Sequence, residues 1–124
     1  MTERYPLSLN AVNVVCFKID WDENALKVLL IKRNITPQKN KWSLPGGFVK
    51  ASENIEDAAL RKFVEETGIA RSYLSQVRTY SDSKRDIRDV GKYKVRVVTT
   101  SFIGIYTFDK LNSISLSNIG HDAN

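Results

Sequence analysis

Residues 54–67 have the apolar spacing of an amphipathic helix, and this segment limits the fold classes that the chain can adopt. Its apolar side chains recur at steps of three and four residues, which places them on one face of a helix. They are Ile55, Ala58, Ala59, Phe63 and, at the margin of the face, Val64. Asn54 is a suitable N-cap, and Gly68 is suitable to end the helix. We therefore predict a helix from 54 to 67.

The segments around this helix are rich in β-branched and aromatic residues that alternate with polar ones, a pattern typical of strands. The predicted strands are 11–19, 27–33, 73–80 and 93–108, with a turn at 20–24 and a charged loop at 81–92. Strands that flank a single helix indicate an α/β (α+β) fold with a mixed sheet, and they argue against a helical bundle.

The length of 124 residues, of which 42% are hydrophobic, suits one domain with one modest core. We expect a single domain over residues 1–124, with an ordered core over 9–108 and a polar tail over 109–124. The sequence has no run of about 18 apolar residues and no secretory signal, so we expect a cytoplasmic protein without a membrane span. Cys16 is the only cysteine, and its apolar neighbours predict a core thiol.

The stretch from Gly47 to Ile69 carries the candidate chemistry. Positions 62, 65 and 66 of the predicted helix stand at i, i+3 and i+4, so they share one helix face. Carboxylates on such a face can hold divalent cations. Taken alone, a pair such as Glu65 and Glu66 is more often a solvated helix face. The spacing of the whole stretch decides between these two interpretations.

That spacing resembles the signature of the Nudix hydrolase (MutT-like) family. The signature is a Gly, five residues, Glu, seven residues, Arg-Glu, an apolar residue, any residue, Glu-Glu, any residue, Gly and an apolar residue. The matching residues are Gly47, Glu53, Arg61, Phe63, Glu65, Glu66, Gly68 and Ile69. The segments 29–33 and 42–46 also look like the family's approach to the motif. The resemblance covers residues 9–121 and implies the Nudix fold, a mixed β-sheet sandwiched by helices.

The resemblance also implies roles for the residues of the motif. Glu65 and Glu66 would hold Mg²⁺ or Mn²⁺ together with the backbone carbonyl of Gly46. Arg61 would brace the loop before the helix, with Glu53 as its expected partner. The glycine pair also suits a tight turn without any ligand, and the two interpretations are compatible.

Lys62 departs from the signature, because the family has a Glu at this position. In the family that Glu is a metal ligand, and in some members it is assigned the role of general base. An ammonium cannot ligate a cation, so Lys62 beside Glu65 and Glu66 should weaken metal binding and hydrolysis, or could replace one metal charge. The alternative is that Glu56, Asp57 or another carboxylate compensates, which would leave an active hydrolase.

Residues 73–102 look like the family branch that contains ADP-ribose pyrophosphatases and Nudix-related transcriptional regulators of NAD metabolism and sugar use. In those regulators the domain senses ADP-ribose or a related metabolite, and a winged helix binds DNA. Such a ligand needs cations for its phosphates and an aromatic ring for its base. The net charge of +5 is compatible with that ligand and equally with simple solubility. The candidate ligand-binding residues are Arg33, Trp42, Phe48, Arg85 and Arg88, although the aromatic ones could be packing residues and the arginines a solvated loop.

Residues 120–123 look like the segment that precedes the last strand of the family, so we expect this chain to lack the closing strand, its helix and any DNA-binding module. A partner subunit could cover the exposed sheet, which predicts a homodimer. Three functions remain open. The first is an ADP-ribose sensor with weak or no hydrolysis, and the second is an active Mg²⁺-dependent pyrophosphatase. The third is a nucleic-acid-binding or RNA-end-processing domain that uses the basic stretch from Lys84 to Arg96.

Overall fold

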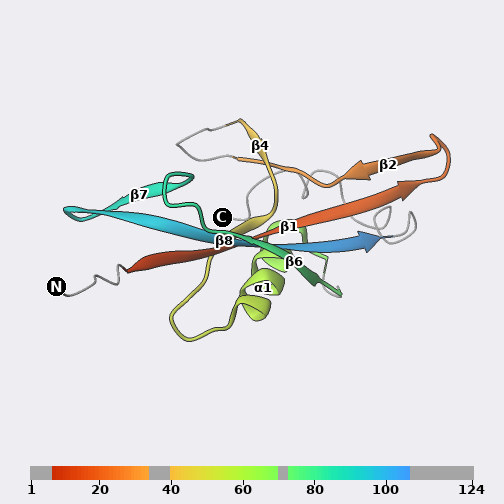
Figure 1. Ribbon diagram of the computed structural model, residues 1–124. Coiled ribbons are helices and arrows are strands. Elements are labelled where there is room, and N and C mark those ends of the chain that lie inside the picture. Colours follow the sequence, from red (N-terminus) through yellow and green to blue (C-terminus); the bar gives the residue numbers. More distant parts are fainter. Residues whose placement is uncertain (1–6, 34–39, 70–72, 107–124) are drawn as a thin grey trace.

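The computed structural model describes residues 7–33, 40–69 and 73–106. Within these ranges the chain forms a six-stranded sheet, a two-stranded sheet and one helix (Figure 1). The large sheet contains β1 (Ser8–Asp20), β2 (Ala25–Val28), β5 (Gly46–Phe48), β6 (Ser75–Tyr80), β7 (Ile87–Val90) and β8 (Tyr93–Tyr106). The small sheet pairs β3 (Ile31–Lys32) with β4 (Trp42–Ser43), and the helix is α1 (Ile55–Thr67).

Two long parallel strands, β1 and β8, form the centre of the large sheet, and their register runs from Ser8↔Arg96 to Lys18↔Tyr106. Both β2 and β5 pair antiparallel with the other edge of β1. Likewise, β6 and β7 pair antiparallel with the other edge of β8. The sheet is therefore mixed, as the sequence predicted.

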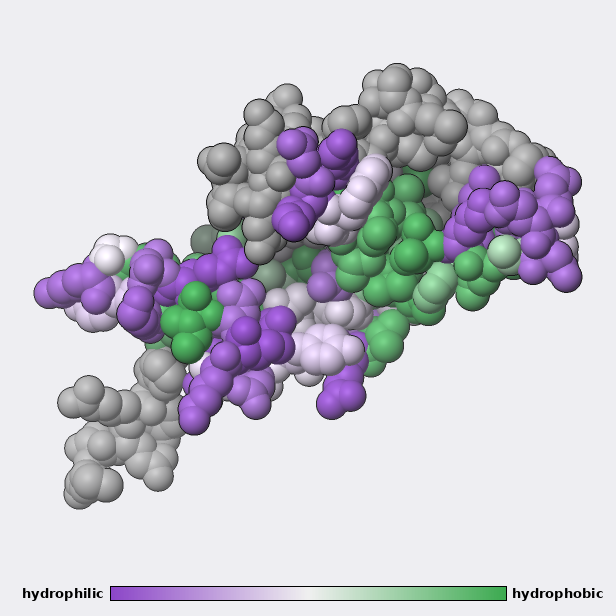
Figure 2. All heavy atoms as spheres, turned by 90° about the horizontal axis from the view of Figure 1, so that it is seen from above, coloured by the Kyte–Doolittle hydropathy of each residue, from purple (hydrophilic) through white to green (hydrophobic). Residues whose placement is uncertain are grey.

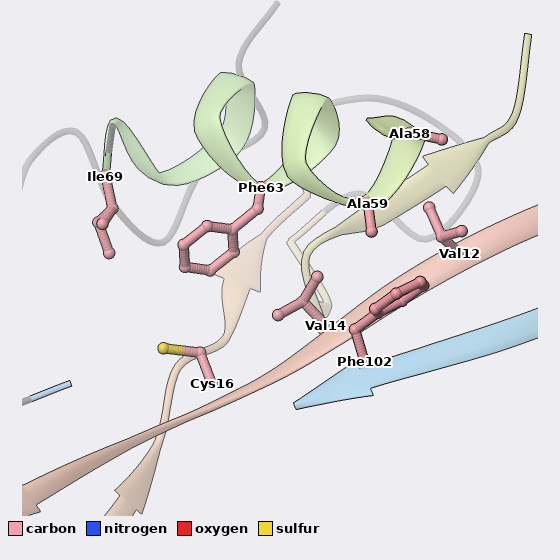
Figure 3. Close-up of a cluster of buried hydrophobic side chains, with 8 residues drawn as sticks. All are labelled: Val12, Val14, Cys16, Ala58, Ala59, Phe63, Ile69 and Phe102. Atoms are coloured by element: carbon pink, nitrogen blue, oxygen red, sulfur yellow. The ribbon is translucent and has the colours of Figure 1, made fainter. Parts of the chain in front are cut away.

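The core lies between α1 and one face of this sheet (Figure 3). Alternate residues of β1 point toward the helix because side chains alternate across a strand. The buried cluster consists of Val12, Val14, Cys16, Ala58, Ala59, Phe63, Ile69 and Phe102. Cys16 is fully buried in this cluster, which confirms the predicted core thiol, and burial raises its pKa to about 12.

The ends of α1 follow the predicted capping residues. The side chain of Asn54 accepts a hydrogen bond from the Asp57 N–H at 2.8 Å. Gly68 adopts the left-handed conformation with φ of 76°, and its N–H donates to the carbonyl of Val64 at 2.9 Å. Both contacts satisfy backbone groups that a helix end leaves unpaired. No helix in the described part of the chain is long and apolar enough to cross a membrane.

Two predicted segments were wrong in detail. The predicted strand 27–33 is divided between β2 and β3. The Leu29 N–H donates to the Cys16 carbonyl of β1 at 2.8 Å, and from Ile31 onward the chain pairs with β4 in the small sheet, where Ile31 lies opposite Ser43. The predicted loop 81–92 contains β7, which forms a hairpin with β8 around Gly91 at φ of 61°. All four residues of β7 are exposed, so the apolar alternation that reveals a strand is missing. The predicted tail and its lack of closing elements concern residues outside the described ranges.

Candidate functional site

Arg61 ties α1 to the loop before it and to β5. Its guanidinium donates to Glu53 Oε1 at 2.6 Å and to Oε2 at 3.0 Å. The same side chain donates to the carbonyl of Phe48 at 3.0 Å. Glu53 also accepts from the Lys50 N–H at 2.8 Å. The Arg61 hydrogen bond, together with that from Lys50, lowers the pKa of Glu53 to about 2. This arrangement fixes the loop against the start of the helix.

Glu66 connects the other end of α1 to the glycine pair. It is buried, and its Oε1 accepts the Gly46 N–H at 2.7 Å. Pro45 and Val49 bond to β1, so by the alternation of an antiparallel ladder Gly46 directs its N–H and its carbonyl to the opposite edge. A side chain at Gly46 would collide with the backbone of Val12. The glycine therefore allows β5 to lie close to β1 while its polar groups face away from β1.

Lys62 lies across the second glycine of the pair. A Cβ atom at Gly47 would stand 2.6 Å from Lys62 Cε, so the absence of a side chain there makes room for the lysine. The ammonium is 3.4 Å from Glu65 Oε2, and Glu65 Oε1 is also 3.4 Å from Arg61. Partial burial raises the pKa of Glu65, but the charges of Lys62 and Arg61 outweigh it and lower the pKa overall.

The candidate metal-binding carboxylates already have other partners in the structure. Glu65 lies between two cations, and Glu66 is bound to a backbone N–H. Glu56 and Asp57, the candidates for compensation, are exposed in the first turn of α1. Within the described ranges, no group of three or more His, Cys, Asp or Glu side chains could hold a metal ion. Among the described residues, a divalent cation would therefore have to be held by the predicted set of Glu65, Glu66 and the Gly46 carbonyl, and both carboxylates already have other partners.

The structure divides the candidate ligand-binding residues into two groups. The Arg88 guanidinium lies 5.5 Å from the centre of the Phe48 ring, and Arg85 donates to Thr99 Oγ1 at 2.8 Å. Those residues belong to the large sheet and its connecting loop. Trp42 belongs to the small sheet, where it is exposed and its ring lies 5.9 Å from Lys32 Nζ. The Arg33 N–H donates to the Lys41 carbonyl at 2.8 Å next to that sheet.

The basic stretch 84–96 does not form a single cationic surface. Arg88 pairs with Asp86 at 2.8 Å, and Lys94 pairs with Asp89 at 2.6 Å. The register also places the side chains of Arg88 and Lys94 on opposite faces of the hairpin. The nucleic-acid hypothesis therefore loses the feature that motivated it.

The protein is an α+β domain with a site where a loop meets a helix. Its mixed sheet carries a glycine pair on β5, and the Glu-bearing helix α1 is braced by the pair of Arg61 and Glu53. The chain belongs to the Nudix family, since the model of the NUDIX domain matches residues 9–114.

Two curated relatives support this assignment. The chain is 43% identical over 86 residues to the ADPR responsive transcriptional repressor NtrR of Acinetobacter baylyi, covering 68% of this chain and 34% of the repressor. It is 40% identical over 86 residues to the ADP-ribose pyrophosphatase of Methanocaldococcus jannaschii, covering 69% of this chain and 49% of that enzyme. The chain thus spans about a third and about half of the length of these relatives.

The fold also resembles solved structures. The NUDIX domain of Shewanella oneidensis NrtR, crystallised with ADP ribose, superposes with a TM-score of 0.67 at 29% identity, covering 84% of this chain and 64% of that one. A MutT/nudix family protein from Enterococcus faecalis gives a TM-score of 0.69 at 34% identity, covering 85% of this chain and 39% of that protein.

Proposed function

We propose that this Nudix domain binds ADP-ribose or a related nucleoside diphosphate compound and hydrolyses it slowly or not at all. The observation that carries the proposal is Lys62, which pairs with Glu65 and lies over Gly47. Its ammonium stands where the family motif has a metal-binding carboxylate. A cation in this place weakens the binding of Mg²⁺ or Mn²⁺ and supplies a fixed positive charge for a phosphate instead.

The biological role that we propose is the ligand-sensing part of a cytoplasmic transcriptional regulator. The repressor of Acinetobacter baylyi, whose name states that it responds to ADPR, supports this role, as does NrtR, whose structure contains ADP ribose. NrtR has also been crystallised with a 27mer DNA. We propose that DNA is bound through a module other than this domain and that the domain acts as a homodimer.

Calorimetric titration of ADP-ribose into the domain, with and without Mg²⁺, tests the proposal when the same mixtures are assayed for AMP and ribose 5-phosphate. We expect binding that is largely independent of Mg²⁺, without measurable turnover. Release of AMP at about 1 per second or faster in Mg²⁺ would contradict it, since that is an ordinary enzymatic rate. Failure of ADP-ribose to bind under either condition would also contradict it.

An active pyrophosphatase is the second candidate, favoured by the 40% identity to the enzyme of Methanocaldococcus jannaschii. In that case a carboxylate other than residue 62 would activate water. The variant Lys62→Glu separates the two functions. A sensor disabled by Lys62 gains Mg²⁺-dependent turnover in the variant, whereas an enzyme with a rearranged site is active as wild type and becomes no faster.

A further inference from the structure

The face of the large sheet that points away from α1 carries two rows of side chains across four strands. Residues paired in register point to the same side of a sheet. One row runs Phe48, Ala11, Thr99 and Tyr80, and the next runs Gly46, Asn13, Ser101 and Arg78. The two inner strands contribute short side chains, and the outer strands contribute most of the long ones.

This face is divided into an apolar half and a polar half. The apolar half follows the C-terminal parts of β1 and β8 and consists of Val15, Phe17, Val28, Ile103 and Ile105. Figure 2 looks onto this side of the molecule and shows hydrophobic spheres right of the centre, with hydrophilic ones toward both ends. The polar patch, as we name it, consists of Asn13, Arg78, Tyr80, Arg85, Thr99 and Ser101.

The floor of the polar patch presents hydrogen-bond donors without acceptors. Ser101 Oγ donates to Asn13 Oδ1 at 2.6 Å, and Thr99 Oγ1 accepts from Arg85 at 2.8 Å. Both hydroxyl residues are at least nine-tenths buried. Among the described residues, the Asn13 amide N–H groups and the Thr99 hydroxyl proton have no acceptor. Thr99 is largely buried, Asn13 is partly exposed beside it, and buried polar groups are rarely left unpaired, so these donors point to an acceptor-rich ligand.

The rim of the patch presents two guanidinium groups next to an aromatic ring. Arg78 and Arg85 lie 5.3 and 6.0 Å from the centre of the Tyr80 ring. In the described ranges neither arginine has a carboxylate partner, whereas Arg61 and Arg88 both do. Both guanidinium groups lie over the phenol ring, and a guanidinium plane is itself a surface on which a planar ring can stack.

We propose that the polar patch binds the base-bearing half of the nucleoside diphosphate ligand. The base stacks on the guanidinium of Arg85, which the Tyr80 ring supports from behind, and its ring nitrogens accept from Asn13 and Thr99. A ribose phosphate has no π face for this surface, which is why we assign the base and not the second sugar. The inference rests on the proposed function, since it places one part of that ligand.

The patch and the loop–helix site meet at β5. Gly46 belongs to the second row of the patch, and its N–H is held by Glu66 of α1. A ligand with its base on the patch therefore extends its diphosphate over the glycine pair toward Lys62. One ligand molecule would therefore pass over the edge strand β5, with its base on the polar patch and its diphosphate at the loop–helix site.

The two halves of ADP-ribose, AMP and ribose 5-phosphate, serve as separate probes in calorimetric or NMR titrations. We expect Tyr80→Ala and Arg85→Ala to weaken AMP binding about tenfold or more, the range for loss of one base-stacking partner. Thr99→Val, which keeps the shape and removes the hydroxyl, should weaken AMP binding as well. The affinity for ribose 5-phosphate should stay unchanged in all three variants.

Tyr93→Ala is the matched control. Tyr93 is also an exposed tyrosine with a cation near its ring, Lys92 at 5.6 Å. It lies six residues from Thr99 along β8, which is about 20 Å at roughly 3.3 Å per residue. Its replacement should leave AMP binding unchanged. Melting temperatures of all variants show whether each one folds. If Tyr80→Ala does not fold, Thr99→Val still tests the inference.

The outcomes separate this inference from the proposed function. If ADP-ribose binds the wild type and the folded patch variants bind AMP as tightly as the wild type does, the inference is wrong and the proposed function stands. An effect on ribose 5-phosphate alone would place the second sugar on the patch and overturn the inference. If ADP-ribose does not bind but AMP does, with the expected losses, the patch is a nucleotide site and only the proposed function fails. If neither ADP-ribose nor AMP binds, both the inference and the proposed function are wrong.

Discussion

Gly46 and Gly47 are adjacent, yet a side chain at each position would meet very different neighbours. At Gly46 a methyl group would collide with the backbone oxygen of Val12, which cannot move without displacing β1. At Gly47 it would meet the end of the Lys62 side chain, which can swing into solvent. We expect Gly46→Ala to destabilise the fold by about 1–3 kcal/mol and Gly47→Ala by less than about 1 kcal/mol, measured by urea unfolding. Equal losses would show that Lys62 is as rigid as the strand.

The pair of Glu53 and Arg61 makes stability depend on pH in a defined window. The Arg61 hydrogen bond lowers the folded pKa of Glu53 from its ordinary value of 4.5 to about 2. A lowered folded pKa stabilises the fold above pH 4.5, and this contribution is lost as the pH falls toward 2. We therefore expect the difference in urea midpoint between wild type and Glu53→Gln to shrink from pH 6 to about pH 2.5. A difference that stays constant over this range would contradict the shifted pKa.

At the residue scale, sequence reasoning found the members of the loop–helix site better than their contacts. The spacing of the motif identified Glu53, Arg61 and Glu66, and the structure places all three where α1 meets the preceding loop and β5. It did not identify Tyr80 or Thr99. Their proximity depends on the register of β6 against β8, which shifts between Gln76 and Arg78. Such a bulge changes the face of the sheet on which a side chain lies, and the hydropathy pattern of the sequence does not indicate where a bulge occurs.

Asn54 controls the start of the element that carries the candidate site. Its side chain accepts the Asp57 N–H at 2.8 Å. We expect Asn54→Ala to destabilise the fold by about 1 kcal/mol, because the N–H then loses its partner. Asn54→Asp keeps an acceptor at the positive end of the helix dipole and should preserve stability within a few tenths of a kcal/mol. Thermal or urea unfolding of both variants measures this, and an equal loss in both would exclude the cap as the cause.

Among the elements, those with strong local signals were predicted and those set by pairing were not. The helix was found because its caps and its apolar spacing agree, as a local sequence signal requires. The long strand β8 was found because its β-branched residues run through a buried centre. The short strands β4, β5 and β7 exist because a partner strand lies beside them, and two to four residues carry too little pattern to predict that.

The molecule as a whole has one sheet face covered by α1, while the apolar half of the other face includes exposed side chains. Val28 and Ile105 are 44% and 64% exposed. Apolar surface of this kind favours association, and a two-fold dimer would bring the same patch of two copies together. We expect sedimentation velocity to show a dimer for the wild type. We expect Ile105→Asp to weaken association about a hundredfold, because it buries an unpaired charge in the interface.

Val90→Asp places the same charge at another exposed apolar side chain, 45% exposed, on β7 outside the apolar half. This variant should remain dimeric. Because the polar patch lies on other rows of the sheet, Ile105→Asp should keep the wild-type affinity for AMP even as a monomer, which separates loss of association from loss of folding. A wild type that sediments as a monomer at every concentration, or a Val90→Asp variant that dissociates as Ile105→Asp does, would show that this half of the sheet does not join two copies.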